Sequence, residues 1–214
     1  FREILDSCPY INEVITCDFK NRDKNIGFLK LAERLRSEDF DISIDLQNNR
    51  RSHLIAALSF VKERYGFSNG KFSFLLNRKI NMPNKFIDPV EHQGSVLGLL
   101  GITGLDKRIE LWTTADSDDW AEKLLHGSWL QKNHKLVAIS LSASKKWKSK
   151  SWGINSMAQL ADLLAKKKEV RVVVIGAKEN EEEAKEFIKK VSCNPINVVG
   201  KTSIPQLVSL LKRC

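Results

Sequence analysis

The chain has 214 residues, of which 42% are hydrophobic and 29% charged, and its formal net charge at pH 7 is +9. No apolar run approaches the roughly 20 residues of a membrane-spanning helix, and the opening FREILDSCPY does not have the pattern of a signal peptide. The length suits two modest domains or one large one. The positive charge favours a polyanion, which could be nucleic acid, anionic lipid headgroups or phosphorylated sugars, or simply a basic surface without a specific partner.

The first half of the chain is expected to alternate helices and strands. Apolar periodicity predicts strands over 13–17, 40–46, 64–67 and 108–112, and helices over 26–35, 54–61, 90–100 and 118–130. Between them, residues 68–90 have the least regular pattern. That stretch carries the basic set Lys71, Arg78, Lys79 and Lys85.

The second half has a more regular pattern and follows a short polar bridge, 131–135. Strands are predicted over 136–141, 170–175 and 196–199, and helices over 155–168, over 181–191 and from the capping box Ser203–Gln206 onward. This order predicts a Rossmann-like parallel sheet with right-handed crossovers. We therefore predict an N-terminal domain over 1–130, a linker over 131–135 and a C-terminal domain over 136–214.

The loop after the strand at 136–141 carries the strongest functional signal. Residues 142–150 contain four lysines and three serines, and a helix follows. Ligands bind at the carboxyl ends of strands in open α/β sheets, and amides at a helix start with a nearby lysine suit a phosphate. Ser144 and Lys150 are the candidates. On spacing alone, a solvated charged loop whose tryptophans serve the core is a slightly better explanation.

The next two strands of this half also end in turns that could touch a ligand. Gly176 lies where the chain must leave the sheet, and carboxylates follow that could accept hydrogen bonds from ribose hydroxyls. Helix capping by Glu181 and Glu182 explains most of those acids better. The turn 200–203 could edge a base or simply cap a helix. The chain has no GxGxxG and no GxxxxGK[ST], which counts against dehydrogenase and P-loop functions.

In the first half, Asp45 and Gln47 lie at the carboxyl end of a predicted strand, and Arg50 and Arg51 follow. Asp45 could be a base or a substrate ligand, or a structural carboxylate paired with Arg51. The four histidines show no ligand spacing, so we predict no metal site.

Taken in order, these segments resemble glycosyltransferase family 9, the ADP-heptose:lipopolysaccharide heptosyltransferases. The resemblance rests on FDISIDLQNNRRSHLIAAL (40–58), RYGF (64–67), WKSKSWG (147–153), VVVIGAKENEEEAKEF (172–187) and VVGKTSIPQLVSLL (198–211). It implies an α/β fold of GT-B type, with two Rossmann-like domains whose parallel sheets face each other across a cleft. It also implies that the C-terminal domain binds the nucleotide sugar and the N-terminal domain most of the acceptor.

The resemblance also suggests roles for single residues. Lys150 would act catalytically at the donor's phosphates, with Ser144 beside it, and Thr202 would edge the adenine. A gapless match places Asn180 where the family often has a ribose-binding acid, next to Glu181. Gly176, Asn180 and Glu181 complete the expected donor side, and the acceptor side is expected to use Asp45, Gln47 and Arg51.

Two segments of the family pattern fall outside this sequence. The segment with the proposed catalytic Asp would precede Phe1, and a D-[ST]-G-x-x-H segment would follow Cys214. We therefore expect residues 1–214 alone to be inactive in transfer.

The resemblance implies an inverting, metal-independent transfer of heptose from ADP-heptose to a lipopolysaccharide core-type acceptor. The nucleotide sugar is a substrate, and no cofactor is expected. The implied partners are that donor and an anionic glycolipid, without nucleic acid. The implied location is the cytoplasm, which allows peripheral contact with the inner membrane. The alternatives are a GT-B nucleotide-sugar epimerase and a non-catalytic basic module that binds polyanions.

Overall fold

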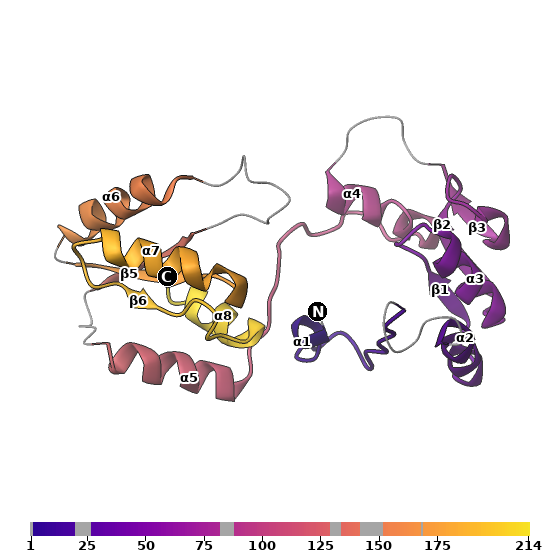
Figure 1. Ribbon diagram of the computed structural model, residues 1–214. Helices are drawn as coiled ribbons and strands as arrows, with labels where there is room; N and C mark the ends of the chain where they lie inside the picture. The colour runs from indigo at the N-terminus through magenta and orange to yellow at the C-terminus, as the bar shows by residue number, and fades with distance from the viewer. Residues whose placement is uncertain (1, 20–26, 82–87, 129–133, 142–151, 168) are drawn as a thin grey trace. The chain divides into compact units, whose positions relative to one another are not determined.

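The computed structural model (Figure 1) describes residues 2–19, 27–81, 88–128, 134–141, 152–167 and 169–214. These residues form two compact units. We call Ile15–Ile109 the N-side unit, and Phe1–Val14 together with Glu110–Cys214 the C-side unit. Each unit contains its own sheet of three described parallel strands, and the predicted α/β class with parallel sheets is confirmed.

The N-side sheet has the strand order β1 (Ile42–Ile44), β2 (Glu63–Phe67), β3 (Arg78–Ile80). Helix α2 (Gly27–Ser37) precedes it, α3 (Arg50–Leu58) connects β1 to β2, and the 3₁₀ turn η1 (Ser73–Leu75) connects β2 to β3. After β3 come α4 (Pro89–Gly94) and η2 (Leu97–Leu100). The core of this unit is a cluster around Tyr65, Phe67 and Val96.

The C-side sheet has the order β4 (Lys135–Ser140), β5 (Val170–Ile175), β6 (Ile196–Asn197). Its helices are α5 (Ala115–His126), α6 (Ile154–Ala165), α7 (Glu181–Lys190) and α8 (Ile204–Leu211). Figure 1 shows α6 and α7 on one side of the strands and α5 on the other. Because side chains alternate along a strand, Val172 and Val174 join the core with Phe187, and Val173 joins the core with Leu210. The prediction that this strand is buried on both faces is confirmed.

The compact units divide at a different place from the predicted domains. Helix α5 was assigned to the first domain, but Trp120, Leu124 and Leu125 pack in the C-side core. The short helix α1 (Arg2–Leu5) also belongs to this unit, since Glu3 accepts a hydrogen bond from the backbone amide of Ile204 at 3.4 Å. Apolar burial against α8 therefore determines the division, and the polar bridge at 131–135 does not.

The predicted elements and the observed ones differ in two further respects. The ranges 13–17 and 108–112 are not strands, because neither pairs with any strand in the described residues. Conversely, β3 lies inside the stretch expected to be irregular. None of the described helices is long and apolar enough to cross a membrane.

Candidate functional site

The carboxyl end of β1 leads into a turn organised by one buried carboxylate. Asp45 is 7% exposed, and its Oδ1 accepts hydrogen bonds from the backbone amides of Gln47 at 2.8 Å and Asn48 at 2.9 Å. Its Oδ2 accepts one from the Ser52 hydroxyl at 2.6 Å. Because this carboxylate accepts hydrogen bonds from two turn amides and from a hydroxyl of α3, it fixes the path of the chain from β1 into α3.

The imidazole of His53 extends this network to a distant loop. His53 is fully buried, and its Nδ1 lies 2.8 Å from the carbonyl oxygen of Lys71. A carbonyl can only accept, so Nδ1 carries the proton and donates it. Nε2 lies 3.2 Å from Asp45 Oδ2 but makes no hydrogen bond with it. His53 thus holds Lys71 beside the turn, although the two are 18 residues apart.

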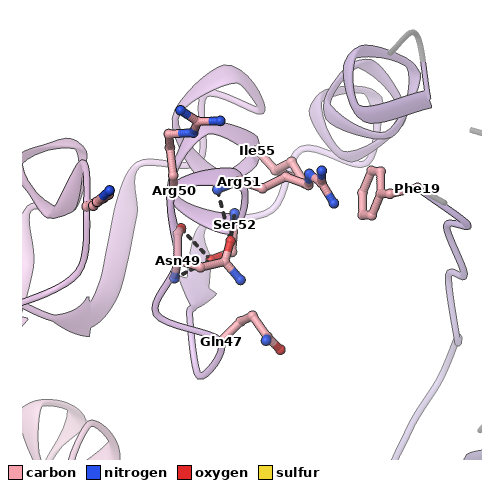
Figure 2. Close-up of a pocket in the computed structure, with 8 residues that line it drawn as sticks. Phe19, Gln47, Asn49, Arg50, Arg51, Ser52 and Ile55 are labelled. Carbon is pink, nitrogen blue, oxygen red and sulfur yellow. Dashed lines mark hydrogen bonds between the residues drawn. The ribbon is translucent and has the colours of Figure 1, made fainter. Parts of the chain in front are cut away.

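Helix α3 begins at this turn with a capping box. The Asn49 side chain accepts hydrogen bonds from the backbone amides of Arg51 and Ser52. The Ser52 hydroxyl in turn accepts one from the backbone amide of Asn49. The cap places Arg50 and Arg51 in the first turn of α3, where both are exposed. Figure 2 shows the Arg51 guanidinium in front of the Phe19 ring, 4.6 Å from its centroid.

These side chains surround an open pocket of about 640 Å³ (Figure 2). Its lining consists of Phe19, Gln47, Asn49, Arg50, Arg51, Ser52, Ile55 and Lys71. The lining includes three cations and several amide or hydroxyl groups, and none of the lining residues is acidic. This lining offers positive charge and hydrogen-bonding groups, which suit an anion that also carries hydroxyl groups.

Two of the three predicted acceptor-side residues line this pocket, and the third does not. Gln47 and Arg51 line it, whereas Asp45 lies behind the turn and is buried. The alternative of an Asp45–Arg51 ion pair is not what the structure shows, because Asp45 contacts Ser52 and His53 instead. Sequence reasoning missed Phe19, Asn49 and Ser52 as lining residues. The Asn49 and Ser52 spacing of a capping box was the signal available.

The C-side unit brings together the two turns that are candidates for ligand contact in the sequence, at Gly176 and at 200–203, at the carboxyl ends of β5 and β6. The amide of Gly200 donates to the carbonyl of Gly176 at 3.0 Å, so the two turns lie side by side. Gly200 has a φ of +70°, which favours glycine, and a Cβ there would stand 2.8 Å from Glu181 Oε1. The Glu181 carboxylate therefore lies against the Gly200 turn, two residues before the partly buried Thr202.

Asn180 has a local structural role. Its Oδ1 accepts from the amide of Ala177 at 3.2 Å, and its Nδ2 donates to Glu183 Oε2 at 2.8 Å. The side chain thus stabilises the start of α7. Asn180 thus contacts the turn after β5, whereas the Glu181 carboxylate lies against the turn at Gly200.

Ser144 and Lys150 lie outside the described residues. The structure describes what comes before and after that loop: β4 ends at Ser140, and α6 begins at Ile154 after Gly153. Among the described residues, no group of three or more His, Cys, Asp or Glu side chains could hold a metal ion.

Comparisons with known proteins agree with this architecture. The lipopolysaccharide core heptosyltransferase OpsX of Haemophilus influenzae is 25% identical over 221 residues, which cover 98% of this chain and 59% of OpsX. A family 9 glycosyl transferase from Veillonella parvula superposes with a TM-score of 0.89 at 20% identity, over 100% of this chain and 61% of that one. The ADP-heptose lipopolysaccharide heptosyltransferase II of Escherichia coli superposes with a TM-score of 0.72 at 20% identity, over 100% and 65%.

The chain thus spans about three fifths of the length of these relatives. The structural likenesses confirm the predicted α/β fold of GT-B type with parallel sheets. The sequence profile of the family described as glycosyltransferase family 9 (heptosyltransferase) matches residues 28–214, which include most of both units. The chain belongs to glycosyltransferase family 9.

Proposed function

We propose that this chain supplies the acceptor and donor sites of a heptosyltransferase that acts on a lipopolysaccharide core-type acceptor. The observation that carries the proposal is a pair of polar sites at carboxyl ends of parallel strands. One is the cationic pocket after β1, and the other is the set of paired turns after β5 and β6. In support, Escherichia coli heptosyltransferase WaaC, with a TM-score of 0.59 and 22% identity, was solved with ADP-2-deoxy-2-fluoro heptose.

The donor in this proposal is ADP-heptose, bound by the C-side unit. Lys150 and Ser144 bind the two phosphates, Thr202 borders the adenine, and Glu181 accepts hydrogen bonds from the ribose hydroxyls. Gly176 and Gly200 leave room for the nucleotide to approach the backbone closely. Asn180 supports this site through the start of α7 and does not contact the ribose.

The acceptor in this proposal binds at the N-side pocket. Arg50, Arg51 and Lys71 would pair with acidic groups of a glycolipid, and Gln47 would hydrogen-bond its sugar hydroxyls. Asp45 contributes by holding the turn that carries Gln47. The acceptor would be the cytoplasmic-face form of an inner-membrane glycolipid, since a nucleotide-activated sugar is its co-substrate.

The reaction in this proposal is a single displacement with inversion at the anomeric carbon. An acceptor hydroxyl attacks that carbon while the bond to the diphosphate breaks, and Lys150 stabilises the charge that develops on the departing ADP. This electrostatic role replaces a metal ion. We assign the general base that removes the hydroxyl proton to none of residues 1–214.

Calorimetric titration with ADP tests the donor site. Lys150→Ala should weaken ADP binding by about tenfold or more, because a charge-assisted contact to phosphate is lost. Lys148→Ala, in the same loop and of the same chemistry, should bind ADP nearly as tightly as the wild type. Equal losses in both variants would show that the loop contributes only general positive charge.

Transfer itself is tested by mass spectrometry in the protein extended to the length of its relatives. With ADP-heptose and a heptose-free lipopolysaccharide core, the acceptor should gain the mass of one heptose. Conversion of the donor without acceptor would instead indicate the epimerase alternative. Binding of nucleic acid or other polyanions without any ADP binding would indicate the non-catalytic basic module.

A further inference from the structure

The loop between β2 and β3 presents two aromatic rings to solvent. Phe72 is 39% exposed and Phe74 is 72% exposed, and their ring centroids lie 5.8 Å apart in an edge-to-face arrangement. Phe72 has a left-handed φ of +68°, which is uncommon and strained for a large side chain. Exposed apolar rings in a strained conformation contribute little to folding and suggest contact with something outside the chain.

The loop that carries these rings is firmly held. The carbonyl of Lys71 accepts from the buried His53, the carbonyl of Leu75 accepts from Arg64 Nε at 2.8 Å, and the Ser73 hydroxyl donates to the carbonyl of Ser68 at 2.6 Å. Leu76, which follows η1, is only 2% exposed. The rings are therefore presented from a fixed backbone, and binding a partner would cost little ordering entropy.

The charges around the rings are mostly positive, and the one acidic neighbour in sequence, Glu63, forms an ion pair with Arg78 at 3.0 Å. Residues 64–81 contain four cations, Arg64, Lys71, Arg78 and Lys79, and no Asp or Glu. Lys71 and Lys79 are exposed. Lys79 is in register with Gly66, and a Cβ on Gly66 would meet Leu76, so Lys79 lies on the face of the sheet against which Leu76 packs. Exposed lysines therefore lie next to Phe72 in sequence, at Lys71, and on the strand that follows the loop, at Lys79.

We propose that Lys71, Phe72, Phe74 and Lys79, the aromatic–basic patch, dock this chain on an anionic membrane surface. Exposed aromatic rings insert at the boundary between headgroups and acyl chains, and flanking lysines pair with anionic headgroups. Lys71 belongs both to this patch and to the pocket lining. The inference rests on the proposed function to this extent: docking here would bring the pocket to the surface where a glycolipid acceptor presents its sugars.

Vesicle co-sedimentation of the 214-residue chain tests the proposal. The vesicles are pure phosphatidylcholine, or phosphatidylcholine with phosphatidylglycerol, and contain no glycolipid, so the result does not depend on acceptor recognition or on transfer. The wild type should bind the anionic vesicles, more weakly as salt rises, and should bind neutral vesicles poorly.

The patch is probed with Phe72→Asn/Phe74→Ser, in which Asn tolerates the left-handed conformation. This variant should lose about tenfold or more in vesicle partitioning, because two rings no longer insert. Lys71→Gln and Lys79→Gln should each lose about fivefold. An unchanged thermal unfolding midpoint shows that the loss does not come from misfolding.

Phe60→Asn is the matched control. Phe60 is 62% exposed, has a φ of +56° and lies in the same unit, but it stacks with Arg36 and is not part of the patch. It should retain wild-type partitioning. The proposal is overturned if the wild type does not bind anionic vesicles, or if Phe60→Asn loses as much as the double variant. Because ADP titration does not involve the patch, it distinguishes a failure of this inference from a failure of the proposed function.

Discussion

At the scale of single residues, Asp45 shows how one carboxylate can organise a pocket it does not line. Its two oxygens hold two turn amides and the Ser52 hydroxyl, and its neighbour His53 holds the carbonyl of Lys71. Pocket residues on either side therefore keep their positions through buried contacts. The side chains that would meet a ligand, Gln47 and Arg51, remain free to face solvent.

Replacing this carboxylate with an amide should destabilise the N-side unit. In Asp45→Asn, the amide nitrogen cannot accept a hydrogen bond, so at least one buried partner loses its acceptor. We expect a cost of about 2 kcal/mol in the free energy of unfolding, measured in urea. ADP binding should not change, since the proposed donor site lies in the other unit.

Asp41→Asn provides the comparison for that prediction. Asp41 forms a 3.2 Å ion pair with Lys62, and both side chains are mostly exposed. An exposed pair contributes little, so this variant should stay within about 0.5 kcal/mol of the wild type. Equal effects of the two substitutions would mean that the buried network does not hold the turn.

At the scale of elements, the paired turns after β5 and β6 depend on a glycine that cannot gain a side chain freely. In Gly200→Ala, the new Cβ would meet Glu181 Oε1 at 2.8 Å and the Lys178 backbone at 3.2 Å. The Glu181 carboxylate must therefore move. If Glu181 binds ribose as proposed, ADP affinity should fall by about fivefold to tenfold, measured by calorimetry.

The control for this substitution is Gly104→Ala. Gly104 has nearly the same φ, +71°, and open space around its ideal Cβ. Gly104→Ala therefore introduces the same backbone strain, about 1 kcal/mol, without a close contact like the one between the new Cβ at position 200 and Glu181. ADP affinity that stays at the wild-type value in Gly200→Ala would remove Glu181 from the donor site.

The sequence predicted some elements well and others poorly for a physical reason. β5 spans Val170–Ile175 as predicted, because a strand buried on both faces must be apolar throughout. β3 has only three residues, with two cations among them, and exists because the edge of β2 is available to it. The stretch 108–112 also contains apolar residues, but it pairs with none of the described strands.

The candidate site divides in the same way. The position of Gln47 and Arg51 after a strand could be predicted, because carboxyl ends of parallel strands collect ligands. The arrival of Lys71 beside them could not, since it depends on a buried hydrogen bond from His53. The placement of Lys150 as the catalytic donor residue stays a prediction that titration must test.

At the scale of the whole molecule, the C-side unit is closed by contacts between segments far apart in the chain. Ser209 of α8 donates to Asp118 of α5 at 2.8 Å, and Arg213 lies 3.4 Å from the same carboxylate. The polar bridge at 131–135 lies between α5 and α8 in sequence. The domain boundary predicted there therefore differs from the division between the two compact units, which falls before α5. Helix α5 is a structural part of the C-side unit.

This contact predicts how the stability of the unit depends on pH. The hydrogen bond from Ser209, and then those from Thr113 and Arg213, hold the pKa of Asp118 below its usual value. A carboxylate with a lowered pKa stabilises the folded state above the unfolded pKa of about 4, and that contribution is lost as pH falls through the folded pKa. Asp118→Asn should therefore lower the urea midpoint of the C-side unit at pH 7 and make much less difference near pH 3.

Asp119→Asn removes the same charge from an exposed position of the same helix and should shift the midpoint little at either pH. A deficit in Asp118→Asn as large at pH 3 as at pH 7 would mean that shape alone, and not the ionised carboxylate, joins α5 to α8.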